Sequence, residues 1–153
     1  MGSKSDLPVA EKAVGVLRDY GVQMEVRVLS AHRCPNEARE FAASAREGGF
    51  SVILAFAGMA AHLAGAMAAN TTLPVIGVPC SGTKLDGMDA LLSTVQMPRG
   101  IPVLTVAIGK AGAVNAAIAA VQMLALSDES FAQKLSDFRK AQTEEVLSAQ
   151  FPD

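Results

Sequence analysis

Four short apolar runs, separated by longer stretches with helical spacing, constrain the fold of this chain more than any other feature. Three of the runs lack a clean alternation of apolar and polar residues, which is typical of parallel strands covered on both faces. Strands that alternate with helices predict right-handed β-α-β crossovers. We therefore predict an α/β fold with a doubly wound parallel sheet, whose ligands bind at the carboxyl ends of the strands. The predicted strands are residues 22–29, 52–56, 75–78 and 103–108.

Five stretches between and after these runs have helical spacing, at residues 8–20, 35–47, 60–69, 88–96 and 112–126. The third and the fifth are apolar on almost every side. Helices of this kind are buried all round, which one small domain does not easily achieve. We therefore expect a homo-oligomer in which neighbouring subunits supply part of the cover.

The length of 153 residues fits a single domain, with a core at residues 1–126. Residues 127–150 are rich in charge and carry apolar side chains at roughly helical spacing. This pattern predicts an amphipathic C-terminal helix. We expect this helical arm to pack either on its own core or on a neighbouring subunit.

Composition excludes several classes of protein. The 13 basic and 15 acidic side chains give a formal net charge of -2, which provides no basic surface for a nucleic acid. Half of the residues are apolar, which excludes a disordered chain. The N-terminus has no apolar stretch like a signal peptide, so we expect a cytoplasmic protein. The uncharged run at 52–69 is rich in alanine and glycine and contains a histidine, so we expect no membrane span.

The first residues form a loop of small side chains that opens a helix. Ser3, Ser5 and Asp6 precede Pro8, which suits the first turn of a helix. Hydroxyl groups, free backbone N–H groups and the positive end of a helix dipole together suit a phosphate. The alternative is that Ser5 or Asp6 only caps the helix. Neither a P-loop nor a dinucleotide-binding glycine motif occurs, so we predict neither ATP nor NAD as a ligand.

A second loop, at the end of the first predicted strand, carries Ser30, His32, Arg33 and Cys34. A histidine beside an arginine at such a place fits a general acid and base next to a clamp for phosphate or carboxylate. The alternative is a purely structural role for the histidine. Cys34 is either the N-cap of the next helix or, with its thiol ionised beside Arg33, a nucleophile.

A third loop joins the second predicted strand to an apolar helix. Its candidate site residues are Gly58, Ala60, Ala61, His62 and Leu63. Small side chains at such a place allow a ligand to approach the backbone closely.

A zinc site is the rival hypothesis of a different class. His32, Cys34, His62 and Cys80 all follow predicted strands, so a fold of this kind can bring them together. Their spacing is not a metal motif, and no carboxylate stands nearby in sequence to orient either imidazole.

Five motifs in order carry a resemblance to a known family. They are Met-Gly-Ser-Lys-Ser-Asp at 1–6, Ser-Ala-His-Arg-x-Pro at 30–35, Ala-Gly-x-Ala-Ala-His-Leu at 57–63, Pro-Val-x-Gly-Val-Pro at 74–79 and Val-Gln-Met-Pro at 95–98. This series resembles PurE, the family of N5-carboxyaminoimidazole ribonucleotide mutases of purine biosynthesis. The likeness continues at 107–113 and 139–143 and so covers nearly the whole chain. The Ala-Ala-His-Leu motif resembles the bacterial class I type rather than the animal type, which takes carbon dioxide directly.

The resemblance implies a flavodoxin-like three-layer sandwich and an isomerase that needs no cofactor and no metal. The implied reaction moves a carboxyl group from the exocyclic nitrogen of an aminoimidazole ribonucleotide to ring carbon C4. His32 matches the family's catalytic histidine, which protonates the carbamate nitrogen and later removes the C4 proton. The implied assembly is a homo-octamer with sites at the subunit boundaries.

The resemblance also implies roles for the other candidate residues. Ser3, Ser5 and Arg33 match phosphate ligands, Asp6 matches a ribose hydroxyl ligand, and Ser30 is a further site residue. The third loop, with Gly58, Ala60, Ala61, His62 and Leu63, encloses the base and the transferred carboxyl group. Two alternatives remain open, which are direct carboxylation of the unsubstituted ribonucleotide and a module that binds a nucleotide phosphate without turnover.

The chain departs from the family pattern at Cys34, Met59 and Ala64, where the family has threonine, glycine and proline. We expect Met59 to narrow the pocket or to change the backbone there. The family also has a strand before its Met-Gly-Ser motif, and in a flavodoxin-like order this strand is central. We expect that residues upstream of Met1 exist in the natural chain, or that something else fills the slot of that strand.

Overall fold

The computed structural model describes residues 1–149. A short 3-10 turn, η1 (Lys4–Asp6), precedes the first helix. The helices are α1 (Leu7–Tyr20), α2 (Pro35–Ser44), α3 (Leu63–Ala68), α4 (Met88–Val95), α5 (Gly109–Leu124) and α6 (Glu129–Ser148). The strands are β1 (Ile53–Gly58), β2 (Val75–Cys80) and β3 (Leu104–Thr105). No helix within residues 1–149 is both long enough and apolar enough to cross a membrane.

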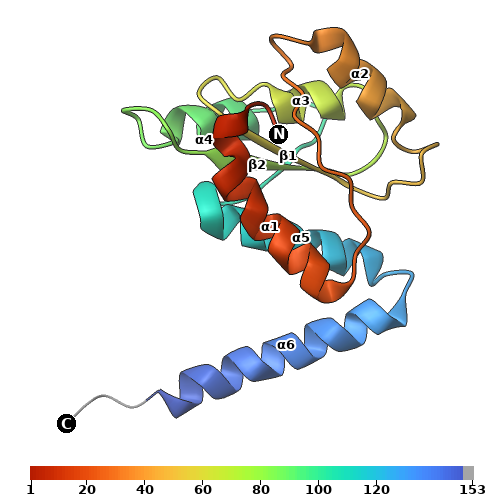
Figure 1. Ribbon diagram of the computed structural model, residues 1–153, viewed down its shortest axis with the longest axis vertical. Helices are drawn as coiled ribbons and strands as arrows, with labels where there is room; N and C mark the ends of the chain where they lie inside the picture. The colour runs from red at the N-terminus through yellow and green to blue at the C-terminus, as the bar shows by residue number, and fades with distance from the viewer. Residues whose placement is uncertain (150–153) are drawn as a thin grey trace.

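The three strands form a parallel sheet in the order β1-β2-β3. Ile53 lies opposite Val75 and Gly58 lies opposite Cys80, so β1 and β2 end at the same edge. Helices cover both faces of the sheet, with α1 and α5 on one face and α2, α3 and α4 on the other (Figure 1). The predicted α/β class, with a parallel sheet between two helical layers, is confirmed.

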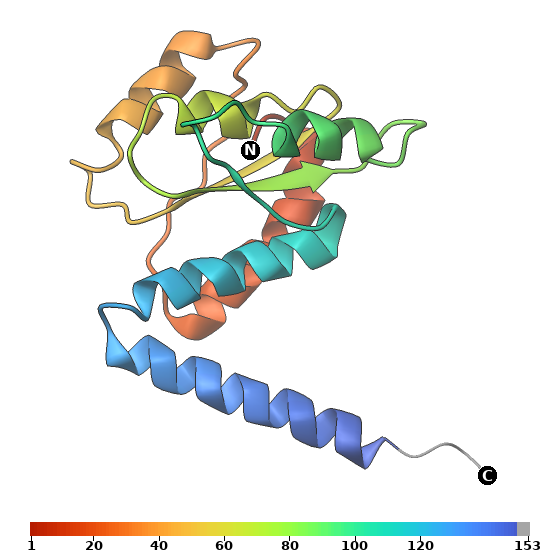
Figure 2. The same ribbon diagram turned by 180° about the vertical axis from the view of Figure 1, so that it is seen from behind.

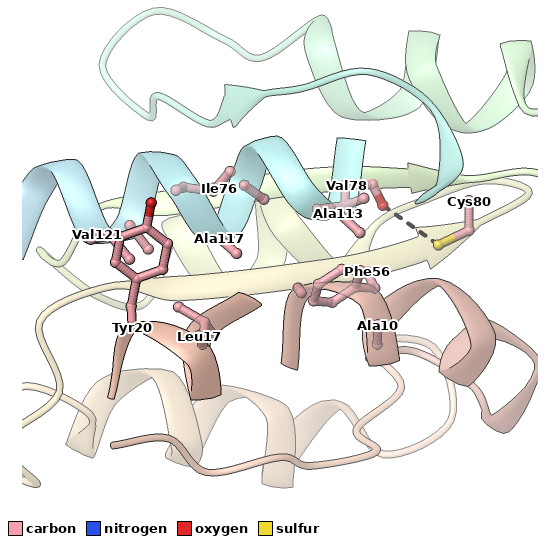
Figure 3. Close-up of a cluster of buried hydrophobic side chains, with 13 residues drawn as sticks. Ala10, Leu17, Tyr20, Phe56, Ile76, Val78, Cys80, Ala113, Ala117 and Val121 are labelled. Carbon is pink, nitrogen blue, oxygen red and sulfur yellow. Dashed lines mark hydrogen bonds between the residues drawn. The ribbon is translucent and has the colours of Figure 1, made fainter. Parts of the chain in front are cut away.

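Two buried clusters hold the layers together, because successive side chains of a strand point to opposite faces. Phe56, Ile76 and Val78 pack towards α1 and α5 (Figure 3), whereas Ile53 and Ala55 pack towards α2 and α3. The contact between α1 and α5 consists largely of alanines that are at most 2% exposed, namely Ala10, Ala13, Ala113, Ala116, Ala117 and Ala120. These small side chains let the two helices approach each other closely.

The prediction of a strand at residues 22–29 is wrong. The segment runs between α1 and α2 without forming a strand. Val22 N–H donates back to Leu17 O of α1 at 2.9 Å. At the other end of the segment, Leu29 N–H donates to Met1 O at 2.8 Å and the Met1 ammonium donates to Arg27 O at 2.7 Å. A strand needs a hydrogen-bonded neighbour along its length. Because only Met1 and Gly2 lie between this segment and β1, that neighbour is present for one rung alone.

The helix α5 finds part of its cover inside its own chain. Seven of its 16 residues are buried, and it contacts α1, β2 and α6. The apolar pattern thus identified a helix that packs into the core correctly. The expectation that neighbouring subunits supply the rest of its cover stays a prediction.

The C-terminal helix α6 divides into two halves. Phe131, Leu135 and Phe138 pack against the α1–α5 cluster, and Lys134 Nζ donates to Tyr20 O at 2.7 Å. Val146 and Leu147 are 73% and 79% exposed, where α6 extends beyond the rest of the chain (Figure 2). The first half thus packs on its own core. Residue 150, the expected end of this helix, lies outside the described residues.

Candidate functional site

Three loops meet at the carboxyl ends of the strands and enclose a hollow of about 430 Å³. This is the edge at which ligands bind in open α/β sheets. All eleven residues that the sequence predicts for the site line the hollow, namely Ser3, Ser5, Asp6, Ser30, His32, Arg33, Gly58, Ala60, Ala61, His62 and Leu63. Four further residues, Gly2, Ala31, Ala57 and Met59, complete the lining.

The first loop is held by short contacts to its own residues and to the sheet. Gly2 N–H donates to Phe56 O at 2.9 Å, and Ser5 N–H donates to Ser3 Oγ at 3.3 Å. Ser3 therefore caps the short η1 turn. Asp6 makes no capping bond to α1, so the alternative in which it serves only as a cap is wrong. The carboxyl group of Asp6 instead lines the hollow, although only 6% of the residue is exposed.

The second loop is tied to the first through Arg33. Its guanidinium donates from Nη2 to Gly2 O at 3.2 Å and from Nε to Ser30 Oγ at 3.3 Å. Sequence reasoning treated Gly2 as part of the phosphate loop but assigned it no site role, and no side chain signals a carbonyl oxygen as an acceptor. The Arg33 contacts fix the positive charge against the backbone of the first loop.

The two histidines of the chain come together across the hollow. The ring centroids of His32 and His62 lie 5.1 Å apart, with the ring planes tilted by 38°. Both residues are exposed and therefore open to a ligand. The second and third loops thus place two imidazoles side by side, an arrangement that can exchange protons with a bound molecule.

The third loop differs from its predicted form. A helix was expected from residue 60, but α3 begins only at Leu63. Met59 has a φ of 58°, which a non-glycine residue adopts at a cost of about 1–2 kcal/mol, and Ala61 N–H donates back to Met59 O at 2.9 Å. This tight turn delays the helix and leaves the Met59 side chain 66% exposed at the rim of the hollow.

Close packing of the strand ends also shapes the third loop. A Cβ atom at Gly58 would lie 3.1 Å from the carbonyl oxygen of Cys80 on β2. Such a contact is tighter than ordinary van der Waals packing, so glycine suits this position, at which β1 ends and the third loop begins.

The zinc hypothesis does not fit the arrangement of its four residues. Within residues 1–149, no three His, Cys, Asp or Glu side chains gather in a cluster that would hold a metal ion. Cys80 is buried and donates to Val78 O, and burial raises the pKa of its thiol to about 12 (Figure 3). A thiol of this kind is a poor source of the thiolate that zinc requires.

The Cys34 side chain shapes the second loop rather than capping the helix that follows. Cys34 is the N-cap residue of α2, but its side chain makes no capping bond. Its sulfur instead accepts a hydrogen bond from Ser30 N–H at 3.0 Å. The thiol thus helps to hold the second loop in shape.

Burial raises the pKa of the Asp6 carboxyl above its ordinary value of 3.8. The backbone of Ser3 and the positive charges of Met1 and Arg33 oppose this effect without cancelling it. The folded protein therefore holds the Asp6 proton at pH values where the unfolded chain has lost it. It follows that the contribution of this carboxyl group to the unfolding free energy is greatest below pH 3.8 and falls as the pH rises through its raised pKa.

The substitution Asp6→Asn tests this linkage because asparagine keeps the shape and does not titrate. We expect the unfolding free energy of the variant, relative to wild type, to be greater at pH 7.5 than at pH 4.5. Urea unfolding of both proteins at the two pH values measures this difference. A relative stability that stays constant, or that grows as the pH falls, would contradict the assignment of a raised pKa to Asp6.

Comparison with known proteins gives consistent results over nearly the whole chain. A family model described as AIR carboxylase matches residues 1–145. The chain is 54% identical over 147 residues to the N5-carboxyaminoimidazole ribonucleotide mutase of Escherichia coli K12. The matched residues cover 96% of this chain and 87% of that relative. It is 52% identical over 149 residues to the protein of the same name from Bacillus subtilis. That match covers 97% of this chain and 92% of the relative.

Two further matches extend the comparison. The phosphoribosylaminoimidazole carboxylase of Saccharomyces cerevisiae is 53% identical over 147 residues, which cover 96% of this chain but 25% of that longer protein. The crystal structure of Treponema denticola PurE has a TM-score of 0.84 and 23% sequence identity, with 96% of this chain and 90% of that chain covered. This structural match supports the fold.

Proposed function

This chain belongs to the AIR carboxylase family, and we propose from that premise that it is an N5-carboxyaminoimidazole ribonucleotide mutase. The enzyme is an isomerase of purine biosynthesis that yields the C4-carboxylated aminoimidazole ribonucleotide. The observation that carries the proposal is the hollow itself, in which a phosphate-type loop lies beside two neighbouring imidazoles.

The ribonucleotide phosphate binds at the first two loops. The Ser3 and Ser5 hydroxyl groups and the Arg33 guanidinium supply donors, and the N-terminus of α1 adds its dipole. The buried Asp6 carboxyl accepts a hydrogen bond from a ribose hydroxyl group, and Ser30 positions Arg33 through its hydroxyl oxygen. This arrangement directs the imidazole base towards the two histidines.

His32 carries out the proton transfers. It donates a proton to the exocyclic nitrogen as the nitrogen–carboxyl bond breaks, which releases carbon dioxide. Ring carbon C4 then attacks the carbon dioxide, and His32 takes the C4 proton as the ring regains its aromaticity. The proton count balances because the same imidazole gives one proton and recovers one. Histidine suits both steps because it can donate and accept a proton near neutral pH.

The third loop confines the freed carbon dioxide. Ala61 and Leu63 are buried, whereas Ala60 and His62 are exposed to the hollow, so the loop presents a small and largely apolar wall. Such a wall excludes water and delays the escape of a small apolar molecule. Gly58 allows this loop to stay close to β2.

A homo-oligomer, an octamer by family resemblance, fits the exposed apolar surface around α4. Leu85, Met88 and Leu92 are 62%, 51% and 53% exposed, and Val95 and Leu104 are each 47% exposed. Side chains of this size gathered on one surface are typical of an interface between copies. We expect the assembled enzyme to be cytoplasmic and to act on a small ribonucleotide without a cofactor.

The test is conversion of synthetic N5-carboxyaminoimidazole ribonucleotide to its C4-carboxylated isomer without added ATP, metal or bicarbonate. We expect full conversion to equilibrium under these conditions. Product that forms only from unsubstituted aminoimidazole ribonucleotide with added bicarbonate would assign direct carboxylation instead. Tight binding without turnover would assign a nucleotide-binding module.

A further inference from the structure

Met59, in the third loop, differs from the other residues that line the hollow. Most of them carry polar groups or have side chains no larger than a methyl group. Leu63 and Met59 are the two with long apolar side chains within the described residues 1–149. Leu63 is 3% exposed and belongs to the core, whereas Met59 is 66% exposed. Met59 therefore presents a large apolar surface that a molecule in the hollow can cover.

The backbone conformation of Met59 makes a side chain at this position costly. Its φ of 58° lies in the left-handed region, which favours glycine because a Cβ atom crowds the backbone there. A side chain can offset such a cost by packing into the core, but most of Met59 is open to solvent. Residues held in sparsely populated conformations gather at active sites and ligand clamps. Packing within the chain thus gives no reason for a side chain here, whereas a contact made when the hollow is filled does.

A short hydrogen bond fixes where the Met59 side chain begins. Ala61 N–H donates to Met59 O at 2.9 Å, which closes a tight turn directly before His62. The ring of His62 lies 5.1 Å from that of His32, and both histidines line the same hollow as Met59. The side chain thus starts on the loop that encloses the imidazole base in the proposed function. The family pattern has glycine here, so a contact made by this side chain is particular to this chain.

We propose that Met59 is a substrate-contact residue, whose thioether packs on the imidazole ring of the bound aminoimidazole ribonucleotide. This inference rests on the proposed function, because that function supplies the aromatic ring. Methionine suits the contact because its side chain is unbranched and its sulfur is polarisable. A sulfur in contact with an aromatic ring strengthens binding by about two- to tenfold.

The contact contributes to binding and specificity rather than to proton transfer. A thioether has no proton to give and is only a weak acceptor, so His32 keeps both proton-transfer steps. The sulfur meets the ring in the substrate and in the transition state alike, which lowers KM more than it raises kcat. A ligand without an aromatic ring gains nothing from the contact. Met59 thus favours ribonucleotides that carry the base over the bare ribose phosphate.

The experiment compares three variants of the full chain. Met59→Ala removes the thioether but keeps a Cβ atom at the positive φ, Met59→Gly removes both, and Met59→Leu keeps most of the apolar surface. We expect the alanine and glycine variants to raise the Kd for aminoimidazole ribonucleotide in calorimetry by about two- to tenfold. KM for the mutase substrate should rise by the same factor, with a smaller change in kcat, and the leucine variant should lose less than either. The Kd for ribose 5-phosphate should stay the same in all three.

Stability and ligand choice separate the contact from a general effect on the loop. The urea midpoint of Met59→Gly should not fall, because glycine suits the positive φ. Equal affinity of wild type and Met59→Ala for aminoimidazole ribonucleotide would overturn the proposal, as would an equal loss of affinity for ribose 5-phosphate. So would a loss in Met59→Gly that Met59→Ala does not share, since the backbone would then be the cause. Absence of turnover in wild type would refute the mutase reaction instead, because the calorimetric comparison needs no turnover; a wild type that does not bind the ribonucleotide would refute both.

Discussion

Replacement of His32 by asparagine is expected to lower kcat for the mutase reaction by about 10²- to 10⁴-fold, the usual contribution of general acid and base catalysis. Asparagine keeps a similar size and a hydrogen-bonding group but transfers no proton. His32 is exposed and the described structure gives it no hydrogen bond, so the fold should keep its stability to within about 0.5 kcal/mol. Steady-state kinetics with synthetic substrate and urea unfolding measure the two effects.

The neighbouring histidine provides a comparison for this variant. His62→Asn removes the ring that lies 5.1 Å from His32. If the third loop encloses the base as proposed, this variant should raise KM more than it lowers kcat. Calorimetric binding of the reaction product to His32→Asn should remain close to that of wild type. If His32→Asn kept more than a tenth of the wild-type kcat, the proton-transfer role would belong to another group.

The second large effect concerns a glycine in the first turn of α5 that is not among the residues lining the hollow. Substitution Gly112→Ala places a Cβ atom on the carbonyl oxygen of Ala107 and 2.6 Å from its carbonyl carbon. Both obstacles are backbone atoms, so only a shift of the chain at the start of α5 can relieve the overlap. We expect a loss of about 3 kcal/mol or more in unfolding free energy, because overpacking of this kind forces the backbone to move. Urea unfolding measures the loss.

A second glycine in a helix supplies the matched control. Gly15 lies within α1, and a Cβ atom there would meet no atom within 4 Å. Gly15→Ala should therefore stabilise the protein by about 0.5–1 kcal/mol, since alanine loses less backbone entropy in a helix. The same glycine-to-alanine substitution is thus expected to lower the unfolding free energy in α5 and to raise it in α1. A Gly112→Ala variant as stable as wild type would show that the start of α5 is free to adjust.

The sequence predicted a strand correctly where its local apolar pattern agrees with the packing of the folded chain. β1 and β2 form within a few residues of their expected bounds because their apolar runs are buried on both faces. Residues 22–29 have a similar pattern and do not form a strand, since pairing requires a neighbour that the pattern of one segment cannot supply. The predicted strand at 103–108 forms only at 104–105, although Val106 N–H still bonds to Gly77 O.

The sequence predicted which residues line the candidate site, but it did not predict how their side chains and backbone are arranged there. A general rule, that loops after parallel strands share one edge, was sufficient to place His62, whose loop follows β1. His32 reaches the same hollow although the segment before it forms no strand, and Ser3 reaches it from a loop that follows no strand. The burial of Asp6 was not predictable, because it depends on how η1 sits against β1. The tilted contact between the two imidazoles and the positive φ of Met59 likewise arise from tertiary packing.

The alanine contact between α1 and α5 limits how this protein can change in evolution. A leucine core tolerates many exchanges because lost and gained methylene groups can compensate each other across the contact. Here each buried side chain is already a single methyl group, so Ala13 and Ala117 can lose volume only by becoming glycine, at a cost in helix stability. Any larger residue would push apart the layer that supports β1 and β2. Sequence drift along this contact is therefore confined to residues of alanine size, and β1, whose end carries the third loop, keeps its position.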